Sequence, residues 1–102
     1  MNYAEILRED TRLMLLRLID EISDRRRGNS AQLTDLHNRL TTKPIAHDEI
    51  KTELRWLAER QLLEIDEAGS VLMVTLTERG HEVATGAAAM AGVARYAPWG
   101  GV

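Results

Sequence analysis

Residues 45–76 read IAHDEIKTELRWLAERQLLEIDEAGSVLMVTL, a stretch in which helical periodicity gives way to a strand pattern. Its first half has apolar positions at helical spacing, which predicts an amphipathic helix that packs along one side. The residues of this stripe are Ile50, Leu54, Leu57 and Gln61. The opposite, free face carries Asp48, Thr52, Arg55 and Glu59.

The second half of the stretch predicts two strands joined by a turn. Leu62, Leu63 and Ile65 shift the pattern toward extended structure, and residues 67–70 (EAGS) supply turn chemistry. Residues 71–76 (VLMVTL) are rich in β-branched side chains, as strands are. A helix followed directly by a hairpin is typical of the second half of a winged helix-turn-helix.

The composition predicts one soluble domain in a reducing compartment. The chain has 102 residues, 44% hydrophobic and 28% charged, which suits a single core. Cysteine is absent, so disulfides and thiolate metal sites are excluded. The charged N-terminus lacks the apolar run of a signal peptide, and no apolar stretch is long enough to span a membrane. We therefore expect a cytoplasmic protein without membrane association.

The segments before the quoted stretch predict two more helices. Residues 2–23 show helical spacing throughout, either as one helix or as a helix capped by Asp10, with a surplus of apolar side chains. Residues 25–29 (RRRGN) predict its end. Ser30 is the expected N-cap of a second helix, Ala31 to Leu40, and Pro44 lies in the turn before a third helix that starts near Ala46.

The packed stripe of the second helix is predicted to comprise Leu33, Leu36, His37 and Leu40. His37 is expected to be a partly buried residue without a chemical role, because it lacks a companion cluster of metal ligands.

The C-terminal part predicts a last helix and a tail. Thr77 can cap a helix running from Glu78 to about Ala89, with Val83 and Ala84 facing inward. The final residues lack periodicity and contain glycines. We therefore expect a winged-helix domain over residues 1–90 and a flexible tail over residues 91–102.

The predicted fold class is mainly α with a small β-hairpin (α+β), in the order helix, helix, helix, strand, strand, helix. We expect one core formed by apolar residues from all of these elements. They are Leu15, Leu18, Ile19, Leu36, Ile50, Leu54, Leu57, Leu72, Val74 and Leu76.

Two segments carry resemblances to known families. DTRLMLLRLIDE (residues 10–21) resembles the first core helix of the arsenical-resistance-repressor type of winged helix, and VTLTERGHEVA (residues 74–84) is similar to the strand-to-helix junction of many winged-helix regulators. Taken whole, the chain resembles a family of roughly hundred-residue proteins of Mu-like transposable phages and prophages. The shared features are YAEILREDTRLMLLRLI, DEIKTELRWLAERQLL, GSVLMVTLTERGHEVA and a GVARYAP-type tail. The resemblance implies a winged helix in a bacterial host cell, and no settled biochemical role.

The leading functional expectation is sequence-specific binding of double-stranded DNA by a regulator, with the third helix in the major groove. On that helix the candidate contacts are His47, Lys51, Thr52 and Arg55, of which Arg55 is suited to guanine. Arg39 and Lys43, just upstream, could contact phosphates. The surplus apolar face of the first helix predicts either a more deeply buried core helix or a homodimer interface.

The charge distribution favours an alternative, an interaction module in phage assembly or host takeover. Its acidic wing and surplus apolar first helix would bind a phage or host protein without touching DNA. The formal net charge is −3, which weakens attraction to phosphates. Acidic residues also dominate the hairpin, namely Glu64, Asp66 and Glu67. Trp56, at the edge of the packed stripe, is expected to be a core-edge residue or a contact anchor.

Catalysis and cofactor binding are not expected. No nucleophile, base and orienting group can be placed together, and neither a glycine-rich phosphate loop nor metal-ligand spacing occurs. His37, His47 and His81 lie on different predicted elements, so we expect no metal site.

Overall fold

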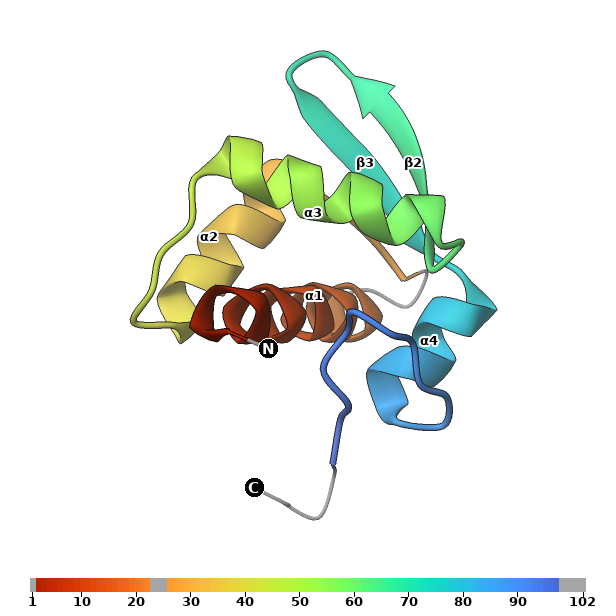
Figure 1. The fold of residues 1–102 in the computed structure, drawn as a ribbon. Coiled ribbons are helices and arrows are strands. Elements are labelled where there is room, and N and C mark those ends of the chain that lie inside the picture. The colour runs from red at the N-terminus through yellow and green to blue at the C-terminus, as the bar shows by residue number, and fades with distance from the viewer. Residues whose placement is uncertain (1, 23–25, 98–102) are drawn as a thin grey trace.

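The computed structural model of the chain describes residues 2–22 and 26–97. Their elements follow the order α1 (Tyr3–Ile22), β1 (Arg27–Asn29), α2 (Ser30–Leu40), α3 (His47–Glu59), β2 (Leu63–Ala68), β3 (Val71–Leu76) and α4 (Glu78–Thr85). This is an α+β fold of the winged-helix kind. Figure 1 shows α3 between α1 on one side and the projecting β2–β3 hairpin on the other.

The first helix is continuous, so Asp10 does not start a second helix. Asn2 caps it, because its side-chain oxygen accepts the backbone N–H of Glu5 at 2.9 Å. The Thr11 hydroxyl donates to the carbonyl of Leu7 at 2.9 Å within the helix. Leu15, Leu16 and Ile19 are fully buried on its inner face, which makes α1 the base on which the other helices pack.

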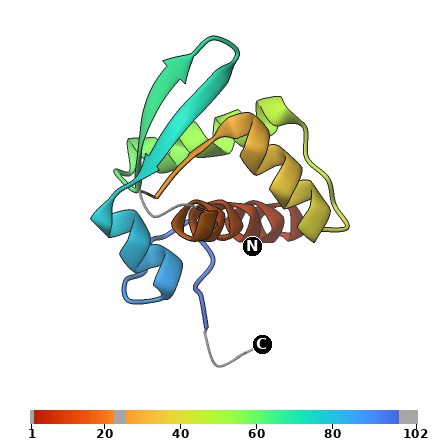
Figure 2. The same ribbon diagram turned by 180° about the vertical axis from the view of Figure 1, so that it is seen from behind.

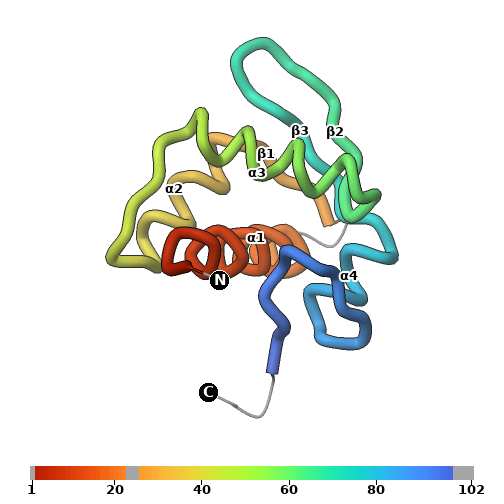
Figure 3. Tube along the Cα trace, in the orientation of Figure 1, coloured from red at the N-terminus to blue at the C-terminus, as the bar shows by residue number. Residues whose placement is uncertain are grey.

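A short strand, β1, is an addition to the predicted order of elements. The sequence predicts only a helix end and loop at residues 25–29, of which Arg25 lies outside the described residues. In the structure Arg27, Gly28 and Asn29 pair antiparallel with Thr75, Val74 and Met73, which gives a three-stranded sheet in the order β1-β3-β2. Figure 2 and the trace in Figure 3 show β1 running along β3, behind α3 in the view of Figure 1.

The start of α2 differs from the prediction by one residue. Asn29 is the N-cap, and its side-chain oxygen accepts the backbone N–H of Gln32 at 2.8 Å. Ser30 is fully buried, and its hydroxyl oxygen accepts the backbone N–H of Leu72 on β3 at 2.9 Å. Ser30 therefore joins α2 to the sheet instead of capping the helix.

The third helix begins after Ala46, as predicted, and Ala46 provides no side-chain cap. Ile50, Leu54 and Leu57 are fully buried. The helix ends at Glu59, so the last member of the predicted stripe, Gln61, lies outside it. Gln61 has a left-handed φ of 65° and is exposed.

The hairpin contains the two predicted strands, but Glu67 and Ala68, predicted to lie in the turn, belong to β2. In β3, Leu72, Val74 and Leu76 are buried while the residues between them are partly exposed. The strands pair from Leu63 with Leu76 to Ala68 with Val71, and Gly69 adopts a positive φ of 65° in the turn. The tip, residues 66–70, is exposed and projects from the body of the molecule.

The last helix starts where predicted and ends earlier. Thr77 accepts the backbone N–H of Gly80 at 3.0 Å, and Val83 and Ala84 are buried. Gly86, with a φ of 85°, caps the helix, so residues 87–89 lie outside it.

Residues 91–97, assigned from sequence to the tail, lie against α1 in the structure. Val93 is 7% exposed, and the backbone N–H of Ala94 donates to the carbonyl of Glu9 at 3.1 Å. The core therefore continues past residue 90. The rest of the expected tail, residues 98–102, lies outside the described residues.

The predicted core is largely the observed one. All ten predicted residues are buried except Leu18 and Leu36, which are partly exposed. Leu40, placed on a packed stripe, is instead 63% exposed because it ends α2 beyond the core. The core also contains buried residues that were not in the predicted core list. They are Leu16, Leu33, Leu62, Leu63, Val83, Ala84 and Val93.

Candidate nucleic-acid interface

The outer face of α3 presents three of the six side chains that the sequence proposes for DNA contact. Thr52 and Arg55 are exposed and Lys51 is partly exposed, on the side opposite the buried stripe of Ile50, Leu54 and Leu57. The Thr52 hydroxyl donates to the Asp48 carbonyl at 3.1 Å. This face is solvent-facing because the helix buries only one stripe.

Arg55 has a partner on the wing. A guanidinium nitrogen lies 3.6 Å from a carboxylate oxygen of Glu67, and the two side chains are 51% and 75% exposed. An exposed pair at this distance contributes little to stability. It does place a negative charge beside the cation best suited to guanine.

His47 points into the fold, away from a ligand on the outer face. Its Nε2 lies 2.8 Å from the Ser30 hydroxyl oxygen. The same hydroxyl oxygen accepts the backbone N–H of Leu72 at 2.9 Å. The histidine thus ties the start of α3 to α2 and β3.

Arg39 and Lys43 lie apart from the outer face of α3. Arg39 pairs with Asp35 on α2 at 3.1 Å, with both side chains largely exposed. Lys43, in the turn between α2 and α3, has its ammonium 5.9 Å from the ring centre of Tyr3 on α1. The structure therefore brings together Lys51, Thr52 and Arg55, and places the other three candidates elsewhere.

Acidic side chains outnumber basic ones around the outer face. On α3 itself the exposed acids are Asp48, Glu49 and Glu59, and on β2 they are Glu64, Asp66 and Glu67. Against phosphate groups this surface is repulsive at long range. Any contact with DNA must therefore depend on short-range interactions with the bases.

Behind α3, two arginines stack on a tryptophan to which the sequence does not connect them. The guanidinium carbons of Arg12 and Arg60 lie 3.8 and 3.6 Å from the ring centre of Trp56. Arg12 also pairs with Glu53 at 2.7 Å and donates to the Gly92 carbonyl at 2.9 Å. Trp56 is thus a core-edge residue, held between α1, α3 and the C-terminal segment.

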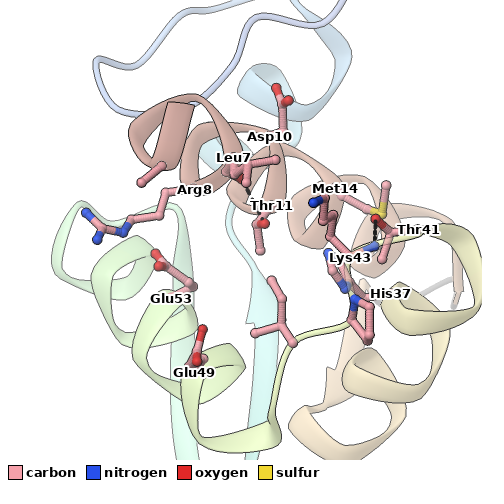
Figure 4. A pocket seen from close by; sticks show the side chains of 13 residues that line it. Leu7, Arg8, Asp10, Thr11, Met14, His37, Thr41, Lys43, Glu49 and Glu53 are labelled. Carbon is pink, nitrogen blue, oxygen red and sulfur yellow. Dashed lines mark hydrogen bonds between the residues drawn. The ribbon is translucent and has the colours of Figure 1, made fainter. Parts of the chain in front are cut away.

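A pocket of about 480 Å³ opens between α1, the end of α2 and the start of α3. Figure 4 shows that side chains from all three converge on it. Leu7, Met14 and Ile45 supply apolar walls, and His37 lines it while only 3% exposed. The sequence places His37 on a packed stripe correctly, but helical spacing alone gives no sign of a cavity beside it.

Within the described residues, no helix combines the length and apolar content that crossing a bilayer would require. In that same part of the chain, no group of three or more histidine, aspartate or glutamate side chains is placed to hold a metal ion.

Comparison with known proteins gives one informative match. No protein-family profile and no solved structure matches the chain. The chain is 35% identical over 99 residues to a protein of Escherichia phage Mu named "Uncharacterized protein gp26", and the alignment covers 92% of this chain and 95% of the Mu protein. At this identity and coverage, the chain belongs to the family of Mu phage protein gp26.

Proposed function

We propose that this phage protein is a regulator that binds double-stranded DNA in the host cytoplasm by placing the outer face of α3 in the major groove. The observation that carries the proposal is the position of Lys51, Thr52 and Arg55 on one solvent-facing side of α3, flanked by a projecting hairpin. A helix held this way by a preceding helix and turn can enter the groove, whose width admits an α-helix.

The charges around this face define the kind of binding to expect. Few cations are available to displace counterions, so affinity for random DNA should be low and should depend only weakly on salt. Specific affinity would come from Arg55 and Lys51 at base edges. A single such helix provides few contacts, so useful affinity needs two copies on a paired site.

A second copy could pack on the outer surface of α1. Leu13, Met14 and Leu18 line a shallow hollow there together with the exposed Leu40 of α2. Asp10, Arg17 and Glu21 border it. An apolar patch with a charged border is typical of a protein contact, and we propose that it is the homodimer interface.

The test is a titration of labelled fragments of the parent phage genome at low and physiological salt. Arg55→Ala should relax base preference and weaken the specific site by about tenfold to a hundredfold. Arg79→Ala removes the same charge from an exposed position on α4, outside the outer face of α3 and the exposed tip of the hairpin, and should change nothing. If no fragment is preferred over random DNA, and Arg55→Ala behaves like Arg79→Ala, the proposal is wrong.

A second candidate function is recognition of a phage or host protein through the wing. It is favoured by the acidic side chains of β2 and by the ion pair that holds Arg55 against Glu67. These carboxylates suit a basic protein surface. A pull-down from phage-carrying cells, with and without nuclease, separates the two functions, because only a direct protein contact survives removal of DNA.

A further inference from the structure

The pocket between α1, α2 and α3 has features of a ligand site, and it shares only Asp10 and Met14 with the hollow proposed as the homodimer interface. Its walls are apolar where Leu7, Met14 and Ile45 meet, and its volume of about 480 Å³ exceeds that of a few water molecules. It lies on the α1 side of α3, whereas Arg55 and Glu67 lie toward the wing. The outer face of α3 is therefore a separate surface.

His37 presents a hydrogen-bond acceptor to this pocket. Its Nδ1 lies 2.9 Å from the side-chain oxygen of Asn38, and that same oxygen accepts the backbone N–H of Ile45. The side-chain carbonyl oxygen of Asn38 has no proton and can only accept, so Nδ1 must be the donor in this hydrogen bond. In a neutral imidazole the proton therefore lies on Nδ1, and Nε2 carries a lone pair.

The lone pair of Nε2 is unused within the described residues. Among the described residues, none donates a hydrogen bond to Nε2. In that same part of the chain, every fully buried side-chain nitrogen or oxygen has a hydrogen-bond partner, so Nε2 is not fully buried. Nε2 must therefore account for part of the small exposed area of His37, and the cavity lined by His37 is this pocket. A nearly buried acceptor that faces a cavity favours a ligand that donates.

The other groups around the pocket narrow the choice of ligand. The Thr11 hydroxyl already donates its proton to Leu7, so it too can only accept. Of the charged residues in the lining, Glu53 is neutralised by Arg12. The remaining charges balance, since they are Arg8 and Lys43 against Asp10 and Glu49. A charged ligand gains little from such a lining, and a neutral one loses little.

We propose that the pocket binds a neutral aromatic group that carries an N–H donor, the chemistry of an indole. Its ring packs on the walls formed by Leu7, Met14 and Ile45, and its N–H donates to Nε2 of His37. Indole is donor-only, which matches two of the polar groups in the lining, Nε2 of His37 and the Thr11 hydroxyl oxygen. The group can be a free small molecule or the tryptophan side chain of a partner protein, since both present the same atoms.

The experiment uses fluorinated probes on the full chain, because fluorine NMR is blind to the chain's own tryptophans. 5-Fluoroindole should bind, and 1-methyl-5-fluoroindole, which lacks the donor, should bind at least about fivefold more weakly. The ¹⁵N resonance of His37 Nε2 should shift with the first probe and not with the second. N-acetyl-5-fluorotryptophanamide distinguishes the two sources, since its binding points to a peptide side chain and its exclusion to a free molecule.

Two matched variants locate the binding. Ala4→Phe places a ring at the mouth of the pocket from an exposed position of α1, and should abolish binding of 5-fluoroindole. Ala31→Phe makes the same change at an exposed position of α2 outside the pocket lining, and should leave binding intact. The proposal is overturned if 5-fluoroindole fails to bind, if both indoles bind equally, or if the two variants behave alike.

Discussion

The guanidinium of Arg55 on α3 lies 3.6 Å from the carboxylate of Glu67 on β2, so the helix and the wing meet in an exposed ion pair. The same cation cannot give its full charge to a nucleic acid while that carboxylate is beside it. The pair thus connects the two candidate functions, because its removal should affect them in opposite directions.

Glu67→Gln is expected to strengthen binding to a preferred DNA fragment about two- to fivefold, since an exposed ion pair is worth at most about this factor. The change also removes one negative charge from the DNA-facing side. Titration by fluorescence anisotropy measures it, with Glu82→Gln, an exposed acid on α4, as the control. If the wing instead binds a basic protein, Glu67→Gln should weaken that association, and unchanged DNA affinity would favour the protein function.

Ser30→Ala should lower the free energy of unfolding by about 1–3 kcal/mol, because it leaves the buried N–H of Leu72 without an acceptor. It also removes the contact between Ser30 and His47. Urea unfolding followed by circular dichroism provides the value. Ser70→Ala, in the exposed turn of the hairpin, serves as the control, and a similar small effect of both changes would contradict the assigned role of Ser30.

Gly92→Ala should destabilise the protein more than Gly69→Ala. Both glycines have a positive φ, 91° and 65°, so both substitutions strain the backbone. Only at Gly92 would the added carbon meet other atoms, since it would lie 2.6 Å from the Trp56 ring, whereas nothing lies within 4 Å at Gly69. We expect a difference of about 1–3 kcal/mol between the two unfolding free energies. Equal values would show that Gly92 does not pack on Trp56 in solution.

Leu40→Glu should convert the proposed homodimer into a monomer without unfolding it, because Leu40 is 63% exposed at the edge of the α1 patch. Burying a carboxylate in an apolar contact is costly unless it finds a partner. Sedimentation velocity at increasing protein concentration measures the change, and a thermal melt checks folding. If the unaltered chain stays monomeric at high micromolar concentration, the interface does not exist.

The elements with strong local signals are those that the sequence predicts well. The stripe of Ile50, Leu54 and Leu57 and the alternation of Leu72, Val74 and Leu76 each identify one face of one element, and tertiary contacts agree with them. The cap of Thr77 is equally local, since its partner is only three residues away.

Other features depend on contacts between residues far apart in the chain. Strand β1 contains Gly28 and Asn29, which are rare in strands, and forms only because β3 supplies its hydrogen bonds. Ser30 has the sequence signal of a helix cap, but its hydroxyl oxygen accepts the backbone N–H of the distant Leu72 instead. His47 appears free on a helical wheel, and only the packing of α2 against α3 turns it toward Ser30. The stack of Arg12 on Trp56 leaves no local pattern at all.

The pairing of β1 with β3 also means that β1 can form its strand only after β3 has been synthesised. It joins Arg27 to Thr75 and so closes a loop that contains α2, α3 and β2. Loop closure of this length costs chain entropy that is recovered only once the distant strands meet. On the ribosome, α1 and the helix-turn-helix can form as they emerge, but residues 27–29 must wait for residues 73–75. A nascent chain stopped before β3 should therefore keep the backbone amides of β1 open to hydrogen exchange, and release of β3 should close them in one step.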